Sequence, residues 1–225
     1  MVCGKTENGL VAFYPFNGNA NDESGNGNNG VVNGATLTTD RFGKANSAYS
    51  FDGVNDYIGQ KETLSVVNTF AISVWINPML NTHEIDIEGS KVGGTNGQKY
   101  VIAPDQGDVT WGSGHAGVGI SSGINGVSVY EHAADYMPPL LVWQSDLISW
   151  THIVVVYNNK QPRLYINGNF VKTGLTSSKI NIHPSNTIGG GLSGYGFFHG
   201  SIDDIRIYNR ALTDAEVLAL YNEGK

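Results

Sequence analysis

Residues 150–174 read WTHIVVVYNNKQPRLYINGNFVKTG, and this stretch carries the clearest signal of the fold class. Apolar residues alternate or cluster in three short runs, at 152–157, 163–166 and 170–173, as they do in half-buried strands. The pairs Asn158-Asn159 and Asn167-Gly168 separate the runs, and Asn-Gly favours a two-residue hairpin turn. The stretch therefore predicts an antiparallel meander of three strands.

On both sides of this meander, the same pattern recurs along almost the whole chain. Further strands are predicted at 10–14, 48–51, 57–58, 70–76, 83–88, 100–103, 118–121, 127–131, 140–142, 187–188 and 202–208. One helix is predicted near the end, because Thr213 and Glu216 form a capping box before the apolar Val217, Leu218 and Leu220. We expect an all-β antiparallel sandwich of two sheets with a short C-terminal helix. It would form one domain at 9–225, after a leader or linker at 1–8.

The composition narrows the classes of partner. The chain of 225 residues has a formal net charge of −7 and only 13 Lys and Arg, so it lacks the basic surface that nucleic acid requires. No apolar run approaches the length of a membrane span, which argues against membrane insertion. Cys3 is the only cysteine, so no intrachain disulfide can form. Neutral molecules and cations are the partners that this composition favours, and the oligomeric state stays open.

The two ends of the chain carry a family resemblance. Residues 13–30 read FYPFNGNANDESGNGNNG and residues 200–214 read GSIDDIRIYNRALTD. Together with FAISVWINP and the meander, in this order, they resemble the laminin-G-like, concanavalin A-like domains of secreted bacterial proteins. The resemblance covers roughly residues 9–223 and implies a jelly roll whose first and last strands lie side by side. It also implies a secreted or cell-surface location, as a module of a larger protein.

The first of these stretches suggests a calcium site. Gly lets the main chain turn its carbonyl oxygens inward, and calcium takes six to eight oxygen ligands. Asp22, with carbonyl groups around Asn17, Gly25 and Gly27, would supply one side of the site. The other side would be Asp203, because the resemblance extends to laminarinase- and lichenase-type enzymes, in which an acid at this point of the last strand binds calcium. Strict alternation places Asp203 on the face of Ile205 and Ile207. The alternative is that Asp22 begins an Asx turn and Asp203 accepts main-chain hydrogen bonds.

An acidic run offers an alternative function. Residues 83–88 read HEIDIE, and a strand there would put Glu84, Asp86 and Glu88 on one face. The run resembles the catalytic strand of laminarinase- and lichenase-type glycoside hydrolases, which implies Glu84 as nucleophile, Asp86 as its modulator and Glu88 as acid/base. Retaining hydrolysis needs carboxyl groups about 5–5.5 Å apart. Glu84 and Glu88 would lie roughly 13 Å apart along an ideal strand, so both side chains would have to lean over Asp86.

The segment 111–143 concentrates aromatic, histidine and acidic residues near Gly and Pro turns. Aromatic rings stack on the C–H faces of sugars, and polar groups bind sugar hydroxyls. We expect the ligand-binding residues here to be Trp111, His115, Tyr130, Glu131, His132, Tyr136 and Trp143. Taken singly, Tyr130 and Trp143 could equally be core residues, and a zinc site from His115 and His132 lacks a third ligand.

These patterns lead to one expected function and two alternatives. The expected function is a calcium-stabilised, lectin-like module that binds a glycan or polysaccharide. The first alternative is a retaining glycoside hydrolase that uses the acidic run. The second is a protein-interaction or adhesive domain, which an absence of glycan binding would favour.

Overall fold

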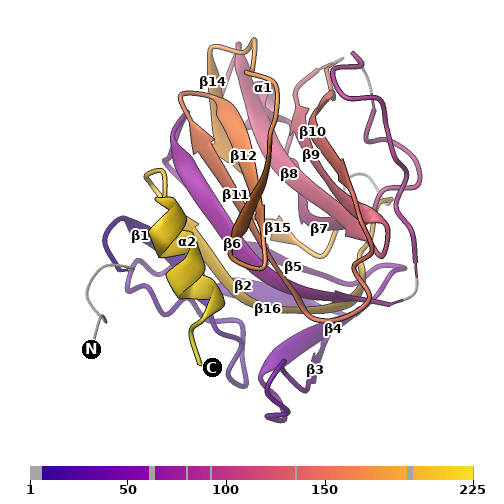
Figure 1. The fold of residues 1–225 in the computed structure, drawn as a ribbon, viewed down its shortest axis with the longest axis vertical. Coiled ribbons are helices and arrows are strands. Elements are labelled where there is room, and N and C mark those ends of the chain that lie inside the picture. The colour runs from indigo at the N-terminus through magenta and orange to yellow at the C-terminus, as the bar shows by residue number, and fades with distance from the viewer. Residues whose placement is uncertain are drawn as a thin grey trace.

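A computed structural model of the protein describes residues 7–60, 64–79, 81–91, 93–134, 136–191 and 195–224. Two β-sheets lie face to face, and a short helix lies outside one of them (Figure 1). Most of the predicted leader at 1–8, including Cys3, lies outside the described residues.

The first sheet, called sheet A, contains the predicted meander. Its strands follow the order β13 (Asn169–Thr173), β12 (Gln161–Ile166), β11 (Thr151–Asn158), β6 (Phe70–Pro78), β16 (His199–Tyr208), β4 (Ala48–Asp52) and β3 (Thr36–Thr38). The eighth strand, β1 (Leu10–Tyr14), pairs antiparallel with the second half of β16. The first and last strands of the chain therefore lie side by side, as expected.

The second sheet, called sheet B, is also mainly antiparallel. Its order is β10 (Pro139–Gln144), β9 (Gly126–His132), β8 (His115–Gly123), β7 (Tyr100–Ala103), β15 (Thr187–Ile188), β5 (Tyr57–Gln60) and β2 (Gly30–Asn33). The eighth strand, β14 (Asn181–Pro184), pairs parallel with the start of β8.

The main core fills the space between the sheets. Alternate residues of β6, such as Ile72 and Val74, are fully buried and face Val118, Ile120 and other inward residues of sheet B. Burying a side chain of this kind stabilises a fold by about 1.5–3 kcal/mol. The period-two pattern of the sequence is the direct consequence of this arrangement, because only one side of each strand meets the core.

A smaller apolar cluster lies on the outer face of sheet A. There Val217 and Leu220 of α2 (Asp214–Tyr221) pack against Val154 and Tyr208. The Thr213 side chain accepts the main-chain N–H of Glu216, and the Glu216 carboxylate accepts that of Thr213, so the predicted capping box is present. A one-turn helix, α1 (Gly107–Thr110), precedes β8. None of the described helices is long and apolar enough to cross a membrane.

Most strand predictions are confirmed, and one is wrong. Every predicted strand except 83–88 corresponds to an observed strand, usually one to three residues longer. Residues 83–88 have no ladder partner and form a loop outside sheet B. Three short strands, β2, β3 and β14, and the helix α1 had no sequence signal strong enough to predict them.

Candidate functional site

A pocket with aromatic walls lies on the outer face of sheet A. Five separate segments supply its walls: β6, the loop after β3, the segment before β11, the turn between β12 and β13, and the end of α2. The pocket has a volume of about 340 Å³ and is lined by Arg41, Phe42, Trp75, Ser149, Trp150, Asn167 and Tyr221. We call it the aromatic pocket. None of its residues was predicted as a ligand-binding residue, because the aromatic side chains come from distant parts of the chain.

A stack of rings forms the floor of this pocket. Trp75 is nearly buried, and its ring stacks on His152 at 5.0 Å and on Tyr221 at 5.7 Å between centroids. Above this floor, Phe42 is 52% exposed, and Trp150 and Tyr221 are half-buried. The pocket therefore offers open aromatic faces on a fixed base.

Arg41 provides the charged part of the pocket. Its guanidinium lies 4.5 Å from the centre of the Trp75 ring and 4.3 Å from that of Phe42. Its two terminal nitrogens bind Asp203 at 2.8 Å and Asp204 at 2.6 Å. Its Nε atom is buried and has no hydrogen-bond partner among the described residues. Arg41 is thus neutralised by the two carboxylates, while one of its donors is still unused.

The position of Asp203 corrects a prediction. Asp204 has a left-handed backbone, with φ of +47°, and the register of β16 against β6 shifts between Asp203 and Arg206. This bulge changes the alternation, so Ile202 joins Ile205 and Ile207 in the core, while Asp203 pairs with Trp75 and reaches Arg41 on the outer face. Burial and the neighbouring Asp204 carboxylate raise the pKa of Asp203 to about 7, although Arg41 acts in the opposite direction.

The other predicted calcium ligands also have protein partners. The Asp22 carboxylate accepts the main-chain N–H groups of Phe13, Ser24 and Asn28, each at 2.9 Å. Burial opposes its ionisation, but these donors hold the pKa of Asp22 below its usual value. The side-chain oxygen of Asn17 accepts from the Lys44 ammonium at 2.6 Å.

These contacts do not fit a cation held between Asp22 and Asp203. Gly25 and Gly27 do have the left-handed backbone expected of the loop, with φ of +88° and +79°. Within the described ranges, no group of three or more His, Cys, Asp or Glu side chains is arranged to hold a metal ion. Calcium binding by the 17–30 loop stays a prediction.

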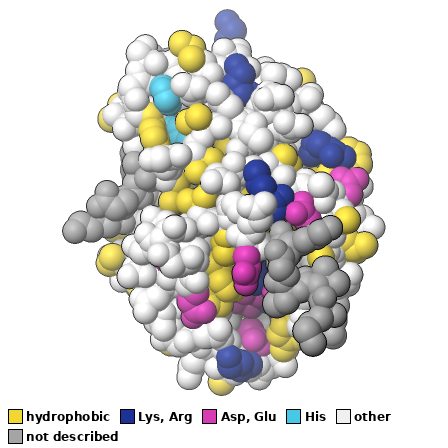
Figure 2. All heavy atoms as spheres, turned by 90° about the vertical axis from the view of Figure 1, so that its left-hand side faces the viewer, with side chains coloured by type: hydrophobic (Ala, Val, Ile, Leu, Met, Phe, Trp, Pro, Cys, Tyr) yellow, Lys and Arg dark blue, Asp and Glu magenta, His cyan; other side chains and the backbone are white. Residues whose placement is uncertain are grey.

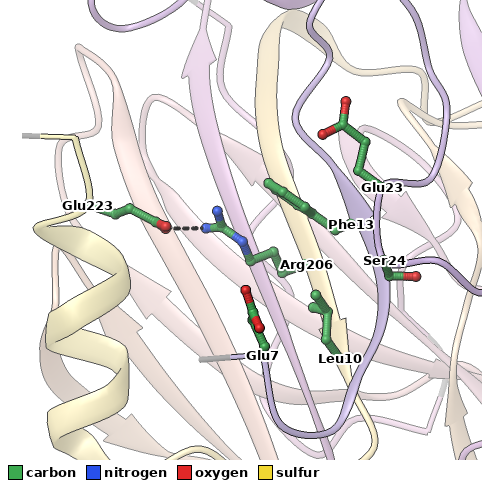
Figure 3. Close-up of a pocket in the computed structure, with 7 residues that line it drawn as sticks. All are labelled: Glu7, Leu10, Phe13, Glu23, Ser24, Arg206 and Glu223. Atoms are coloured by element: carbon green, nitrogen blue, oxygen red, sulfur yellow. Dashed lines mark ion pairs between the residues drawn. The ribbon is translucent and has the colours of Figure 1, made fainter. Parts of the chain in front are cut away.

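A larger groove lies where the two ends of the chain meet. It has a volume of about 540 Å³ and is lined by Glu7, Leu10, Phe13, Glu23, Ser24, Arg206 and Glu223 (Figure 3). Arg206 lies 4.2 Å from the centre of the Phe13 ring and forms an ion pair with Glu223 at 2.8 Å. On the side of the molecule that carries β1 and α2, hydrophobic side chains form an irregular band and acidic side chains gather beside its lower half (Figure 2). Arg206 of β16 packs on Phe13 of β1 and pairs with Glu223, which follows α2. The residues that line this groove therefore hold the two ends of the chain together.

The three acids of the run at 83–88 have separate partners. Glu84 is exposed, Asp86 accepts the Tyr130 hydroxyl at 2.7 Å, and Glu88 binds Lys172 at 2.7 Å and the Val142 N–H at 2.8 Å. Glu84 and Asp86 line one small pocket, and Glu88 is not among its lining residues. The hydrolase alternative requires the three carboxylates to meet in one cleft, and the structure does not bring them together.

Four of the predicted ligand-binding residues lie on the outer side of sheet B. The Trp111 ring is parallel to that of His115, with centroids 6.3 Å apart, and also packs on the buried His183. Tyr130 is fully buried beneath Asp86. The Nδ1 atom of His132 lies 3.1 Å from the main-chain oxygen of Pro104, and no described side chain completes a set of three metal ligands with His132 and His115, so the zinc alternative gains no support.

The other three predicted residues lie near β9 and β10, on the inner side of sheet B or at the edge of this sheet. They are Glu131, Tyr136 and Trp143. Glu131 is fully buried and accepts the Ser177 hydroxyl at 2.6 Å and the Tyr136 hydroxyl at 3.4 Å. Burial raises the pKa of Glu131 to about 7, despite these two donors. Trp143 is partly buried against the main core. The seven residues thus do not form one recognition surface.

Comparison with known families gives one match over most of the chain. The sequence model of the concanavalin A-like lectin/glucanases superfamily matches residues 51–218.

Solved structures share the fold at low identity. Domain 4 of AbnA, a GH43 extracellular arabinanase from Geobacillus stearothermophilus solved with arabinotriose, superposes with a TM-score of 0.67 and 22% identity. That match covers 95% of this chain and 98% of the domain. The binding domain of Paraclostridial Mosquitocidal Protein 1 has a TM-score of 0.66 and 22% identity, over 97% of this chain and 53% of that one.

A third similar structure comes from work on botulinum neurotoxin type C and its interaction with two ganglioside molecules. It has a TM-score of 0.65 and 16% identity, over 96% of this chain and 51% of that one. The present chain therefore spans about half the length of both toxin chains.

Proposed function

The chain belongs to the concanavalin A-like lectin/glucanase superfamily, and we propose that it acts within that family as a carbohydrate-binding module. The observation that carries this proposal is the aromatic pocket. It combines exposed aromatic faces with polar groups in a concave site, which is the composition that sugar recognition requires.

Each part of the pocket has a role in the proposed complex. Phe42, Trp150 and Tyr221 would stack on the C–H faces of sugar rings. The unused Nε donor of Arg41 would be satisfied by a ring or hydroxyl oxygen, which removes the cost of leaving a buried donor unpaired. Asn167 and Ser149 are further polar groups at the wall.

The charge of the pocket favours a neutral sugar. Asp203 and Asp204 neutralise Arg41, so the site has no excess positive charge to attract a uronate or a sulfate. The net charge of −7 of the whole chain acts in the same direction.

The comparisons support the class of ligand without identifying it. AbnA domain 4 was solved with arabinotriose, and the match covers almost the whole of that domain. At 22% identity this likeness concerns the fold, so the binding residues have to be tested in this chain. The same neighbour is part of an extracellular enzyme, which supports the proposal that this module is also extracellular.

Affinity electrophoresis against soluble neutral and acidic polysaccharides, including arabinan, tests the proposal. We expect retardation by a neutral polysaccharide, and a loss of about tenfold or more in affinity for Trp150→Ala and Phe42→Ala. Phe170→Ala is a matched control, because Phe170 is 46% exposed and also lies under an arginine, Arg163 at 4.6 Å, but outside the pocket. Failure to bind any glycan would favour the protein-interaction alternative.

A further inference from the structure

We propose that the carbohydrate site extends from the aromatic pocket across the outer face of sheet A to a second pocket, and that the module binds an internal stretch of a neutral polysaccharide chain. This inference rests on the proposed function, because the aromatic pocket forms one end of the extended site. The second pocket has a volume of about 440 Å³ and lies beside β3, β4 and the start of β16. We call it the acidic pocket; it is lined by Gly34, Thr36, Ser50, Phe51, Asp52, Asp56, Met79 and His199.

A row of outward side chains joins the two pockets. The row consists of Asn77 in β6, Ser201 in β16, Ser50 in β4 and Thr36 in β3, each paired with the next across adjacent strands. Residues that pair in this way point to the same face of a sheet. Ile202, the neighbour of Ser201, belongs to the main core, so the four side chains point to the outer face. We call them the polar row.

The polar row begins at one pocket and ends at the other. Thr151 pairs with Ile76 at the start of β11, so Trp150, the residue before Thr151, lies level with Asn77. Trp150 lines the aromatic pocket, and Thr36 lines the acidic pocket. Neighbouring strands are about 4.8 Å apart, so the row from Asn77 to Thr36 spans roughly 14 Å. A single sugar cannot cover this length, but a chain of sugars can.

The side chains of the polar row have free hydrogen-bonding groups. Asn77, Ser201 and Ser50 are half-buried, and Thr36 is exposed. Within the described ranges, none of these four side chains forms a hydrogen bond with another residue. Hydroxyl and amide groups both donate and accept, as sugar hydroxyls do. The row therefore offers one such group per strand, at a spacing comparable to the length of one sugar residue.

Each end of the extended site has a nearly buried group with an unused hydrogen-bonding atom. Asp56 is only 8% exposed, and its Oδ2 atom accepts the Asp52 N–H at 2.9 Å. None of the described residues donates a hydrogen bond to its Oδ1 atom, and a sugar hydroxyl in the acidic pocket would do so. At the other end, the buried Nε atom of Arg41 is a donor without a partner in the described part of the chain. A glycan supplies both kinds of partner, since each sugar hydroxyl donates and accepts.

Charge and polarity favour a neutral glycan over other partners. The polar row has no apolar side chain and no charge, whereas the centre of a protein interface is apolar. An anionic chain would meet Asp52 and Asp56 at the acidic pocket, whose lining residues include no Lys or Arg. A neutral polysaccharide meets both conditions.

Calorimetric titration of the full chain with linear arabino-oligosaccharides of three and six sugars tests the inference. If the electrophoresis described above identifies another neutral polysaccharide, its trimer and hexamer take their place. We expect the hexamer to bind about tenfold more tightly than the trimer, which exceeds the few-fold statistical gain from repeated sugars. Equal affinities for trimer and hexamer, both lost in Trp150→Ala, would overturn the extended site and leave the proposed function standing. Absence of binding by every oligosaccharide would overturn both.

Variants in the polar row locate the bound chain. The double variant Asn77→Ala/Ser50→Ala should lower the hexamer affinity about tenfold, to near the affinity of the wild type for the trimer. Thr36→Ala should lower the hexamer affinity about twofold or more. Thr173→Ala is its matched control, because both threonines are exposed and lie on edge strands at opposite sides of sheet A, and it should bind the hexamer as the wild type does.

Thermal melting of each variant separates loss of binding from loss of folding. All of them should melt close to the wild-type Tm, because the altered side chains are polar and make no hydrogen bond within the described chain. Undiminished hexamer affinity in a folded Asn77→Ala/Ser50→Ala variant would contradict the inference.

Discussion

The indole ring of Trp75 stacks on the phenol ring of Tyr221, with centroids 5.7 Å apart and planes inclined by 17°. Trp75 belongs to the central strand β6, and Tyr221 is the last residue of α2. The stack therefore joins the end of the C-terminal helix to the outer face of sheet A. Because Tyr221 also lines the aromatic pocket, the stability of α2 and the shape of the pocket are coupled.

The N-cap of α2 should affect both properties. Thr213→Ala removes the side-chain half of the capping box, which typically costs about 1 kcal/mol. We expect a Tm lower by about 2–4 °C and a modest loss of glycan affinity through Tyr221. Thr213→Ser keeps the hydroxyl and should restore both values. An unchanged Tm in Thr213→Ala would show that the cap does not hold the helix.

Removal of Arg41 should be much more damaging. Arg41→Gln leaves Asp203 and Asp204 without their cation, and losing one partner of a buried ion pair costs about 3–5 kcal/mol. Urea denaturation should show this loss at pH 8. Since the pKa of Asp203 is about 7, its carboxylate is protonated at pH 5, and the variant should then recover part of the lost free energy of unfolding. Arg163→Gln is the control, because its exposed pair with Asp214 should be worth less than about 1 kcal/mol.

Glu131 should make the fold less stable as the pH rises. Burial raises its pKa from about 4.5 to about 7, so the folded state holds the proton more tightly than the unfolded state. The stabilisation that comes from this tighter proton binding is complete below about pH 4.5 and is lost as the pH rises through 7. Glu131→Gln should therefore raise stability at pH 8, on the order of 1–3 kcal/mol, and flatten the change of Tm between pH 5 and 8.

Other charged groups limit how flat the pH dependence of Tm becomes in the Glu131→Gln variant. Lys160 and Lys179 lower its pKa, and Asp203 titrates in the same range with the same sign, so part of the slope should persist in the variant. An identical pH profile in wild type and Glu131→Gln would contradict the assignment.

The acidic run at 83–88 should not hydrolyse glucans. Glu88 is held by Lys172 and the Val142 N–H, away from the pocket that Glu84 and Asp86 line. We expect no release of reducing ends from β-1,3- or β-1,4-glucan. Release that Glu84→Gln and Glu88→Gln each abolish would restore the hydrolase alternative.

Sequence patterns predicted the strands well where a ladder partner enforces them. The run HEIDIE alternates as a strand does, but Ile87 is 81% exposed and Asp86 turns toward Tyr130. Alternation alone could not reveal that no neighbouring strand pairs with this segment. In β16 the predicted alternation holds after the bulge, at Ile205 and Ile207, but the left-handed Asp204 interrupts it, so that Ile202 faces the core and Asp203 lies on the opposite face.

The candidate site could not be predicted from local spacing. Phe42, Trp75, Trp150 and Tyr221 come from four segments that only the sheet order and α2 bring together. The group predicted from the segment 111–143 was instead dispersed, because residues on opposite sides of one strand point to opposite faces. Tyr130 and Glu131 are adjacent in β9 and show this directly: one lies beneath Asp86, and the other points to Ser177.

The indole N–H signals of the four tryptophans provide the most direct test of glycan binding in the aromatic pocket. Trp75 and Trp150 line the pocket, whereas Trp111 and Trp143 lie elsewhere, and Trp→Phe variants would assign each signal in a ¹H–¹⁵N spectrum. On titration with arabinotriose and other neutral oligosaccharides, we expect saturable shifts of the Trp75 and Trp150 signals, with those of Trp111 and Trp143 unchanged. Shifts confined to Trp111 or Trp143, or no shift with a sugar that the protein binds, would contradict it.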